Sequence, residues 1–184
     1  MEEKNHYIIN PDTVLIKSEF DSLGNHCSRV IQGRESFLVK EKPADILNNS
    51  MLYYGSNLPG GIQSTKSKLG NISMCPVVVC SQLNIYWFPL YSPKSEKCIW
   101  LAFTHVGRPE KLSPLKTRVN LRFGHSFELN MKISRFKAKH NQAAELRYIT
   151  EERNQKGLVY YYDPRTGLQL VSEKNPYYSG SDKD

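Results

Sequence analysis

Long hydrophobic runs are absent from this chain of 184 residues. The longest apolar segments, residues 74–80 and 85–91, have seven residues each, whereas a helix that spans a membrane needs roughly 18 or more. The mean hydropathy is −0.53. The first residues contain neither the apolar region nor the small-residue cleavage site of a secretory signal. The sequence therefore predicts a cytoplasmic protein that has no membrane partner.

The residues that hold metals or perform catalysis are also sparse. The four cysteines, Cys27, Cys75, Cys80 and Cys98, form no C-x-x-C pair of the kind that holds structural zinc. The five histidines lie far apart, with no H-E-x-x-H pair, and no serine stands in a G-x-S-x-G turn. We therefore predict no metal, no cofactor and no enzymatic activity.

One segment comes close to a phosphate-binding loop. Residues 60–67 nearly match the P-loop pattern, but Thr65 stands where the second glycine is required. A P-loop must also open a helix, whereas the Gly- and Ser-rich composition predicts a loop here, followed by an extended segment at 72–79. A small nucleotide-dependent enzyme remains an alternative, and it predicts ATP binding through Lys66.

Positive charge is what the chain has in excess. It contains 25 Lys and Arg against 18 Asp and Glu, a net charge of +7. Residues 1–105 carry a net charge of only +1, while residues 108–147 hold ten cations and three acids. A concentrated basic region is typical of nucleic-acid binding, although a solvated basic surface has the same composition.

The hydrophobic pattern predicts an α+β fold whose sheet is mostly antiparallel and built from short strands. The three later strands, at 76–80, 85–88 and 98–105, barely alternate, which indicates burial on both faces. A short helix is expected at about 43–54 and a longer C-terminal helix at about 134–154, with Ser134 as its N-cap. Strands are expected at 7–9, 13–17, 28–32, 36–40, 76–80, 85–88 and 98–105.

The predicted domain covers residues 1–156, and residues 157–184 form a C-terminal arm that we expect to be partly flexible. Within this arm, residues 158–162 and 168–171 flank a turn. The pattern fits either a second hairpin or a loose arm.

The strongest local signal is a hairpin over residues 117–131 that turns at Gly124. Its first strand alternates apolar side chains with Arg118, Asn120 and Arg122, which places these three on one face. Arginine and asparagine on a rigid two-stranded element can contact base edges in a groove, and neighbouring cations can neutralise phosphates. The phosphate contacts predicted here are Lys111, Lys116, Lys132, Arg135, Lys137 and Lys139.

Two other modes of nucleic-acid binding are alternatives to this hairpin. An RNA or single-strand binder would display aromatic side chains on an exposed sheet for base stacking, and the candidates are Tyr86, Trp87, Phe88 and Trp100. The hypothesis of a helix-turn-helix motif has less support from the sequence, because a hairpin and not a second short helix precedes the basic helix.

Four motifs carry a family resemblance that agrees with the DNA-binding interpretation. They are residues 51–57 (Met-Leu-Tyr-Tyr-Gly-Ser-Asn), 72–78 (Ile-Ser-x-x-Pro-Val-Val), 86–89 (Tyr-Trp-Phe-Pro) and 98–105. The chain resembles the ComK family, the competence transcription factors of Gram-positive bacilli, over roughly residues 7–153. The resemblance implies a cytoplasmic activator that binds A/T-rich double-stranded DNA largely through the minor groove and self-associates there. It also implies contact with RNA polymerase and control of DNA-uptake and recombination genes.

The chain departs from the family pattern in two places. Gly60 is followed by Gly61 and Ile62 where the family has Gly-Arg-Lys, as in a divergent paralogue, so phosphate contact by this loop would fall to Lys66 and Lys68. The C-terminal arm matches poorly. Its aromatic-Pro-basic string resembles a segment held by a protease adaptor, although a packed tyrosine strand fits equally well; the residues concerned are Tyr161, Tyr162, Pro164 and Arg165.

Overall fold

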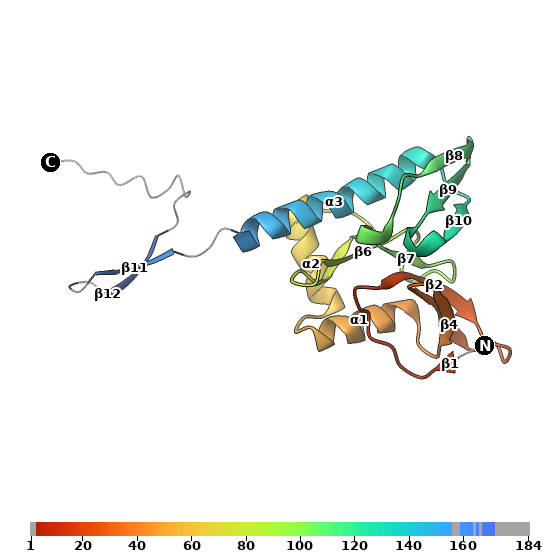
Figure 1. Cartoon of the computed structure of the whole chain (residues 1–184), viewed down its shortest axis with the longest axis horizontal. Helices are drawn as coiled ribbons and strands as arrows, with labels where there is room; N and C mark the ends of the chain where they lie inside the picture. Colours follow the sequence, from red (N-terminus) through yellow and green to blue (C-terminus); the bar gives the residue numbers. More distant parts are fainter. Residues whose placement is uncertain (1–2, 156–158, 164, 166, 172–184) are drawn as a thin grey trace. The chain divides into compact units, whose positions relative to one another are not determined.

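A computed structural model describes residues 3–155, 159–163, 165 and 167–171 (Figure 1). The chain divides into two compact units, Met1–Tyr148 and Ile149–Asp184.

The first unit is built on a seven-stranded sheet in the order β1-β4-β3-β2-β7-β6-β5. Every neighbouring pair is antiparallel except β1 and β4. The predicted α+β class with a mostly antiparallel sheet of short strands is therefore confirmed. The strands are β1 (Glu3–Lys4), β2 (Thr13–Phe20), β3 (His26–Gln32), β4 (Glu35–Val39), β5 (Val77–Cys80), β6 (Ile85–Pro89) and β7 (Ile99–Ala102).

Two helices, α1 (Pro43–Tyr53) and α2 (Leu58–Leu69), connect β4 to β5. The loop predicted for the α2 region is wrong, and local capping explains the helix. The Asn57 side chain accepts a hydrogen bond from the Gly60 amide at 2.8 Å, which satisfies an amide of the first turn. Gly70, at φ 83°, then ends the helix. These signals prevail over the Gly- and Ser-rich composition.

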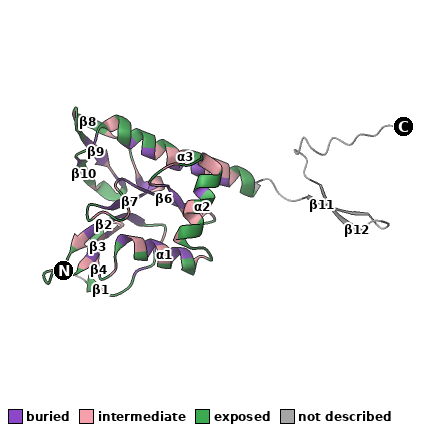
Figure 2. Ribbon diagram, turned by 180° about the vertical axis from the view of Figure 1, so that it is seen from behind, coloured by how far each residue is buried: buried purple, intermediate pink, exposed green. Residues whose placement is uncertain are grey.

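The sheet is buried on both faces because its central strands carry large apolar side chains in both directions. On one face, Trp87 and Trp100 pack with Ile46 and Met51 of α1. The opposite face forms a second core, which includes Phe88 and Leu101. Figure 2 shows the buried strands between exposed outer surfaces. The predicted two-sided burial is confirmed for β6 and β7. For β5 it is wrong, because buried Val77 and Val79 alternate with half-buried Val78 and Cys80.

A three-stranded antiparallel sheet and the first part of helix α3 (Ile133–Gln155) cover the second core. Leu129, Phe136 and Ala143 supply buried contacts from these elements. The predicted hairpin and long helix are confirmed, but β8 adds a strand that the pattern did not indicate, and α3 begins at Ile133. The remaining elements are β8 (Glu110–Ser113), β9 (Lys116–Asn120), β10 (Ser126–Leu129), and the 3-10 turns η1 (Phe103–His105) and η2 (Arg122–Gly124).

The second unit contains a hairpin of β11 (Val159–Asp163) and β12 (Gly167–Val171). Of the two alternatives for this arm, the structure therefore has the hairpin. Tyr161 and Tyr162 lie in β11 opposite Gln169 and Leu168, Arg165 is exposed, and Pro164 lies outside the described residues. An adaptor-binding role for these residues, and a domain limit at residue 156, stay predictions. Among the described helices, none is both long and apolar enough to cross a bilayer.

Candidate nucleic-acid interface

Strand β9 is the middle strand of the small sheet, and its two faces differ as its alternation predicts. Thr117 and Val119 are buried against the second core. Arg118 and Asn120 lie on the opposite face and are half-buried. The structure therefore places these two predicted groove-contact residues side by side on one strand face.

Carboxylates from the flanking strands already hold both side chains. Arg118 Nη2 donates to Glu128 Oε1 of β10 at 3.1 Å, and Asn120 Nδ2 donates to Glu110 Oε1 of β8 at 2.7 Å. The outer face of this sheet thus carries two acids around one arginine, and contact with a base would require an exchange of partners. Sequence reasoning missed this pairing because the registers of β8 and β10 were not known.

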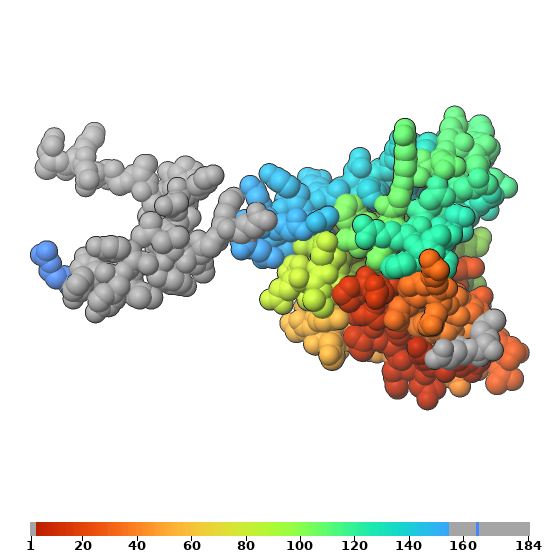
Figure 3. Space-filling model, viewed as in Figure 1, coloured from red at the N-terminus to blue at the C-terminus, as the bar shows by residue number. Residues whose placement is uncertain are grey.

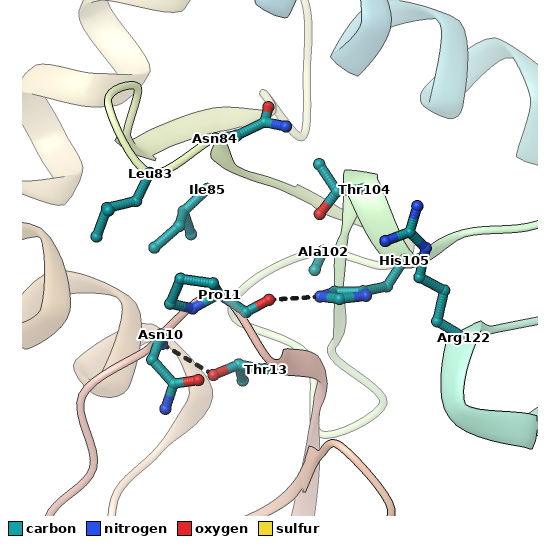
Figure 4. Close-up of a pocket in the computed structure, with 10 residues that line it drawn as sticks. All are labelled: Asn10, Pro11, Thr13, Leu83, Asn84, Ile85, Ala102, Thr104, His105 and Arg122. Carbon is teal, nitrogen blue, oxygen red and sulfur yellow. Dashed lines mark hydrogen bonds between the residues drawn. The ribbon is translucent and has the colours of Figure 1, made fainter.

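Arg122 does not lie on the strand face that carries Arg118 and Asn120, contrary to the prediction. The chain turns directly after β9, through Phe123 at φ 60° and Gly124 at φ 83°, so Arg122 lies in η2 and not on the strand. It lines a pocket of about 170 Å³ together with buried His105 (Figure 4). His105 Nε2 donates to the Pro11 carbonyl at 2.7 Å, which makes this histidine a bridge between two loops.

Three other predicted residues converge on one pocket, which we call the basic pocket. Lys116 begins β9, Lys132 precedes α3, and Arg135 lies in the first turn of α3. A hydrogen bond of 2.7 Å from the Thr117 hydroxyl to the Met131 carbonyl ties these segments together. The basic pocket has a volume of about 610 Å³, and none of the described residues lining it is acidic. They are Ser113, Leu115, Lys116, Asn130, Met131, Lys132 and Arg135.

The neighbouring predicted cations divide into exposed and buried ones. Lys111 and Lys137 are exposed. Lys139 is buried, at 6 % exposure, and its Nζ donates to Met74 Sδ at 3.4 Å. Burial, together with the charge of Arg135, lowers the pKa of Lys139 to about 8. The structure therefore does not place Lys139 on the exposed surface that carries Lys111 and Lys137.

Replacement of Lys139 by methionine is expected to stabilise the fold. Below pH 8 the folded chain holds a buried charge, and its removal should raise the free energy of unfolding by about 1–3 kcal/mol. Thermal unfolding at pH 7 should shift upward by roughly 2–4 °C per kcal/mol. The wild type should gain stability between about pH 8 and 10.5 as Lys139 deprotonates, and K139M should lack this gain. An unchanged or lower Tm at pH 7 would contradict the assignment.

Lys66 and Lys68 lie elsewhere in the unit. Both are in the last turn of α2, and α2 contacts α1 and β5. Neither lysine lines the basic pocket, and the strands β8–β10 beside that pocket form the green and turquoise surface at the upper right of Figure 3. The structure therefore does not bring these lysines to the basic pocket.

Neither single-strand or RNA binding nor nucleotide binding has its required residues in the required place. The four aromatic side chains offered for base stacking are all buried, at 1 % exposure or less, so they form core and not a stacking platform. In the segment resembling a P-loop, Lys66 lies at the end of α2 and not at its start. Within the described residues, no group of three His, Cys, Asp or Glu could hold a metal ion.

His140 packs α3 against the sheet. Its ring lies 4.8 Å from that of Phe103 and 5.9 Å from that of Phe88, between ring centroids. Burial lowers the pKa of His140, and burial also lowers the pKa of His105, near Arg122 and Asp12. The folded state therefore disfavours protonation of both rings relative to the unfolded chain.

Stability should consequently fall as the pH drops from about 6.5 to 5. The unfolded chain takes up protons near pH 6.5 that the folded chain takes up only at lower pH, and each such histidine accounts for at most about 1.4 kcal/mol per pH unit. H140F keeps an aromatic ring and should show a shallower decline of Tm over this range. A decline identical to that of the wild type would contradict the account.

The fold and the site together define an α+β unit with a basic pocket at one edge. The ComK protein family matches residues 4–155, and the chain therefore belongs to the ComK family. It is 26 % identical over 148 residues to the competence transcription factor of Bacillus subtilis (strain 168), which covers 80 % of this chain and 76 % of the relative. No solved structure matches the chain.

Proposed function

We propose that this protein is a transcription activator of competence genes that binds double-stranded DNA, with a preference for A/T-rich promoter boxes contacted largely through the minor groove. Its membership of the ComK family and its similarity to a competence transcription factor support this function. The observation that carries the proposal is the convergence of Lys116, Lys132 and Arg135 on the basic pocket. Clustered cations with no intervening carboxylate are what phosphate neutralisation requires.

The proposed contact residues follow from exposure and charge. Lys111 and Lys137 are exposed and lie on the elements that flank the basic pocket, so they extend the phosphate-binding surface. Glu110 and Glu128 make the outer face of β9 unfavourable for phosphates. The duplex therefore approaches from the side of the basic pocket, and Arg118, Asn120 and Arg122 are the proposed groove contacts, the first two after exchange of their carboxylate partners.

Equilibrium binding of the purified chain to fluorescent oligonucleotides tests the proposal. The probes are an A/T-rich duplex, a G/C-rich duplex of equal length, and the matching single strands of DNA and RNA. The A/T-rich duplex should bind most tightly, and the logarithm of its affinity should fall linearly with the logarithm of the salt concentration, with a slope of about −0.9 per phosphate neutralised. Tighter binding to single strands, or a flat salt profile, would contradict the proposal.

A further inference from the structure

The connection from β8 to β9 displays apolar side chains at a place where the surface is otherwise cationic. Leu115 is 62 % exposed and Leu112 is 39 % exposed. Both belong to the segment that joins exposed Lys111 to exposed Lys116. Leu115 also lines the basic pocket, opposite the cations of the chain entering α3.

This segment forms a tight hairpin turn and not a long irregular loop. Ser113 pairs with Lys116, so only Pro114 and Leu115 lie in the turn. The proline ring fixes one φ angle of that turn. The strand register shifts between Lys111 and Ser113, which leaves Leu112 as a bulged residue, and bulges redirect side chains. Figures 1 and 2 both show the β8–β9 end at the edge of the unit.

We infer that Leu115 is a wedge that inserts between neighbouring base pairs of the bound duplex. This inference rests on the proposed DNA-binding function. Proteins that enter the minor groove use leucine, proline and similar apolar side chains in this way, and the step they unstack becomes a kink. The cations around Leu115 complement the phosphates on either side of such a step. Apolar Leu115 and the cations around it thus match the bases and the phosphates of one partner, a base-paired duplex.

The choice of A/T-rich sites follows from the same contact. Pyrimidine–purine steps such as TA unstack and kink most easily. A wedge therefore favours duplexes that contain such steps even where no side chain donates a hydrogen bond to a base. This gives the chain a source of sequence preference that does not depend on Arg118 or Asn120, whose polar groups are held by carboxylates.

Fluorescence of 2-aminopurine tests the inference with the full chain. An A/T-rich duplex carries this base analogue at each adenine in turn, and a second duplex carries end labels for energy transfer. Wild-type protein should raise 2-aminopurine fluorescence at one step, because the analogue brightens when unstacked, and should bend the duplex by roughly 20–90°. L115A should lose both signals, and L115M, which keeps an apolar wedge, should retain them. The salt slope of L115A should be unchanged, because no phosphate contact is removed.

The outcomes separate the wedge from the proposed function. L52A removes a leucine that is 56 % exposed on α1 and should behave as wild type in every assay. If wild type binds the duplex without unstacking any step, or if L115A unstacks it equally, the wedge is overturned and DNA binding stands. If L115A changes only self-association in sedimentation, the tip contacts a second copy and the wedge is again overturned. If wild type binds no duplex, both the function and the wedge fail.

Discussion

Replacement of Lys116, Lys132 and Arg135 by glutamine is expected to lower the affinity for A/T-rich duplex by about 10²–10³-fold near 0.1 M salt. Each neutralised phosphate releases counterions, which contributes a factor of roughly eight between 1 M and 0.1 M salt. The slope of log affinity against log salt should become shallower by about 2.7 for three lost contacts. All three side chains line the surface of the basic pocket, so the variant should keep the fold. Anisotropy titrations at four salt concentrations measure both quantities.

A charge-matched control distinguishes local contact from general attraction. Lys42, Lys94 and Lys97 are exposed lysines outside the basic pocket, and their replacement by glutamine removes the same formal charge. This control should lower affinity far less, since exposed charges beyond a Debye length are largely screened. Equal losses in the two triple variants would show that net charge, and not the basic pocket, determines binding.

Phe136→Ala is expected to destabilise the first unit by about 3–5 kcal/mol. The side chain is completely buried, its ring centroid lies 6.2 Å from that of Phe88, and truncation leaves a cavity where α3 meets the sheet. The Tm should fall by roughly 2–4 °C for each kcal/mol lost. DNA affinity should fall as well, because Phe136 fixes the helical turn that carries Arg135. Chemical denaturation followed by circular dichroism gives the free energy of unfolding.

Leu23→Ala serves as the comparison for this substitution. Leu23 is 85 % exposed in the turn between β2 and β3, and surface truncations of this kind usually change stability by no more than about 0.5 kcal/mol. If Phe136→Ala costs no more than Leu23→Ala, then α3 does not depend on the second core for its position.

The sequence predicts the architecture well wherever one period dominates. The alternation of polar and apolar residues around Val119 predicts the hairpin, because a strand with one buried face has a side-chain period of two. The continuous apolar runs of β6 and β7 predict strands that are buried on both faces. Helix α2 was missed because its cap, Asn57, acts through a single side chain while Gly60 and Gly61 lower the helix propensity.

The candidate site could be predicted only as a set of charges. Lys116, Lys132 and Arg135 come from three separate segments, and only the tertiary fold, through bonds such as that between Thr117 and Met131, brings them to one pocket. The four-residue spacing of Arg135 and Lys139 predicts that both lie on one cationic stripe of the helix, but Lys139 is buried. Its neighbour Lys137 is exposed, and the helical step of 100° per residue separates the two.

Protection of lysines from acylation by bound duplex tests the central claim most directly, because it locates the contact surface on the wild-type chain. At saturating A/T-rich duplex, Lys111, Lys116, Lys132 and Lys137 should react more slowly, while Lys42, Lys94 and Lys97 should react at the rate of the unbound protein. Protection that is confined to Lys66 and Lys68 of α2, or spread evenly over all lysines, would contradict the account.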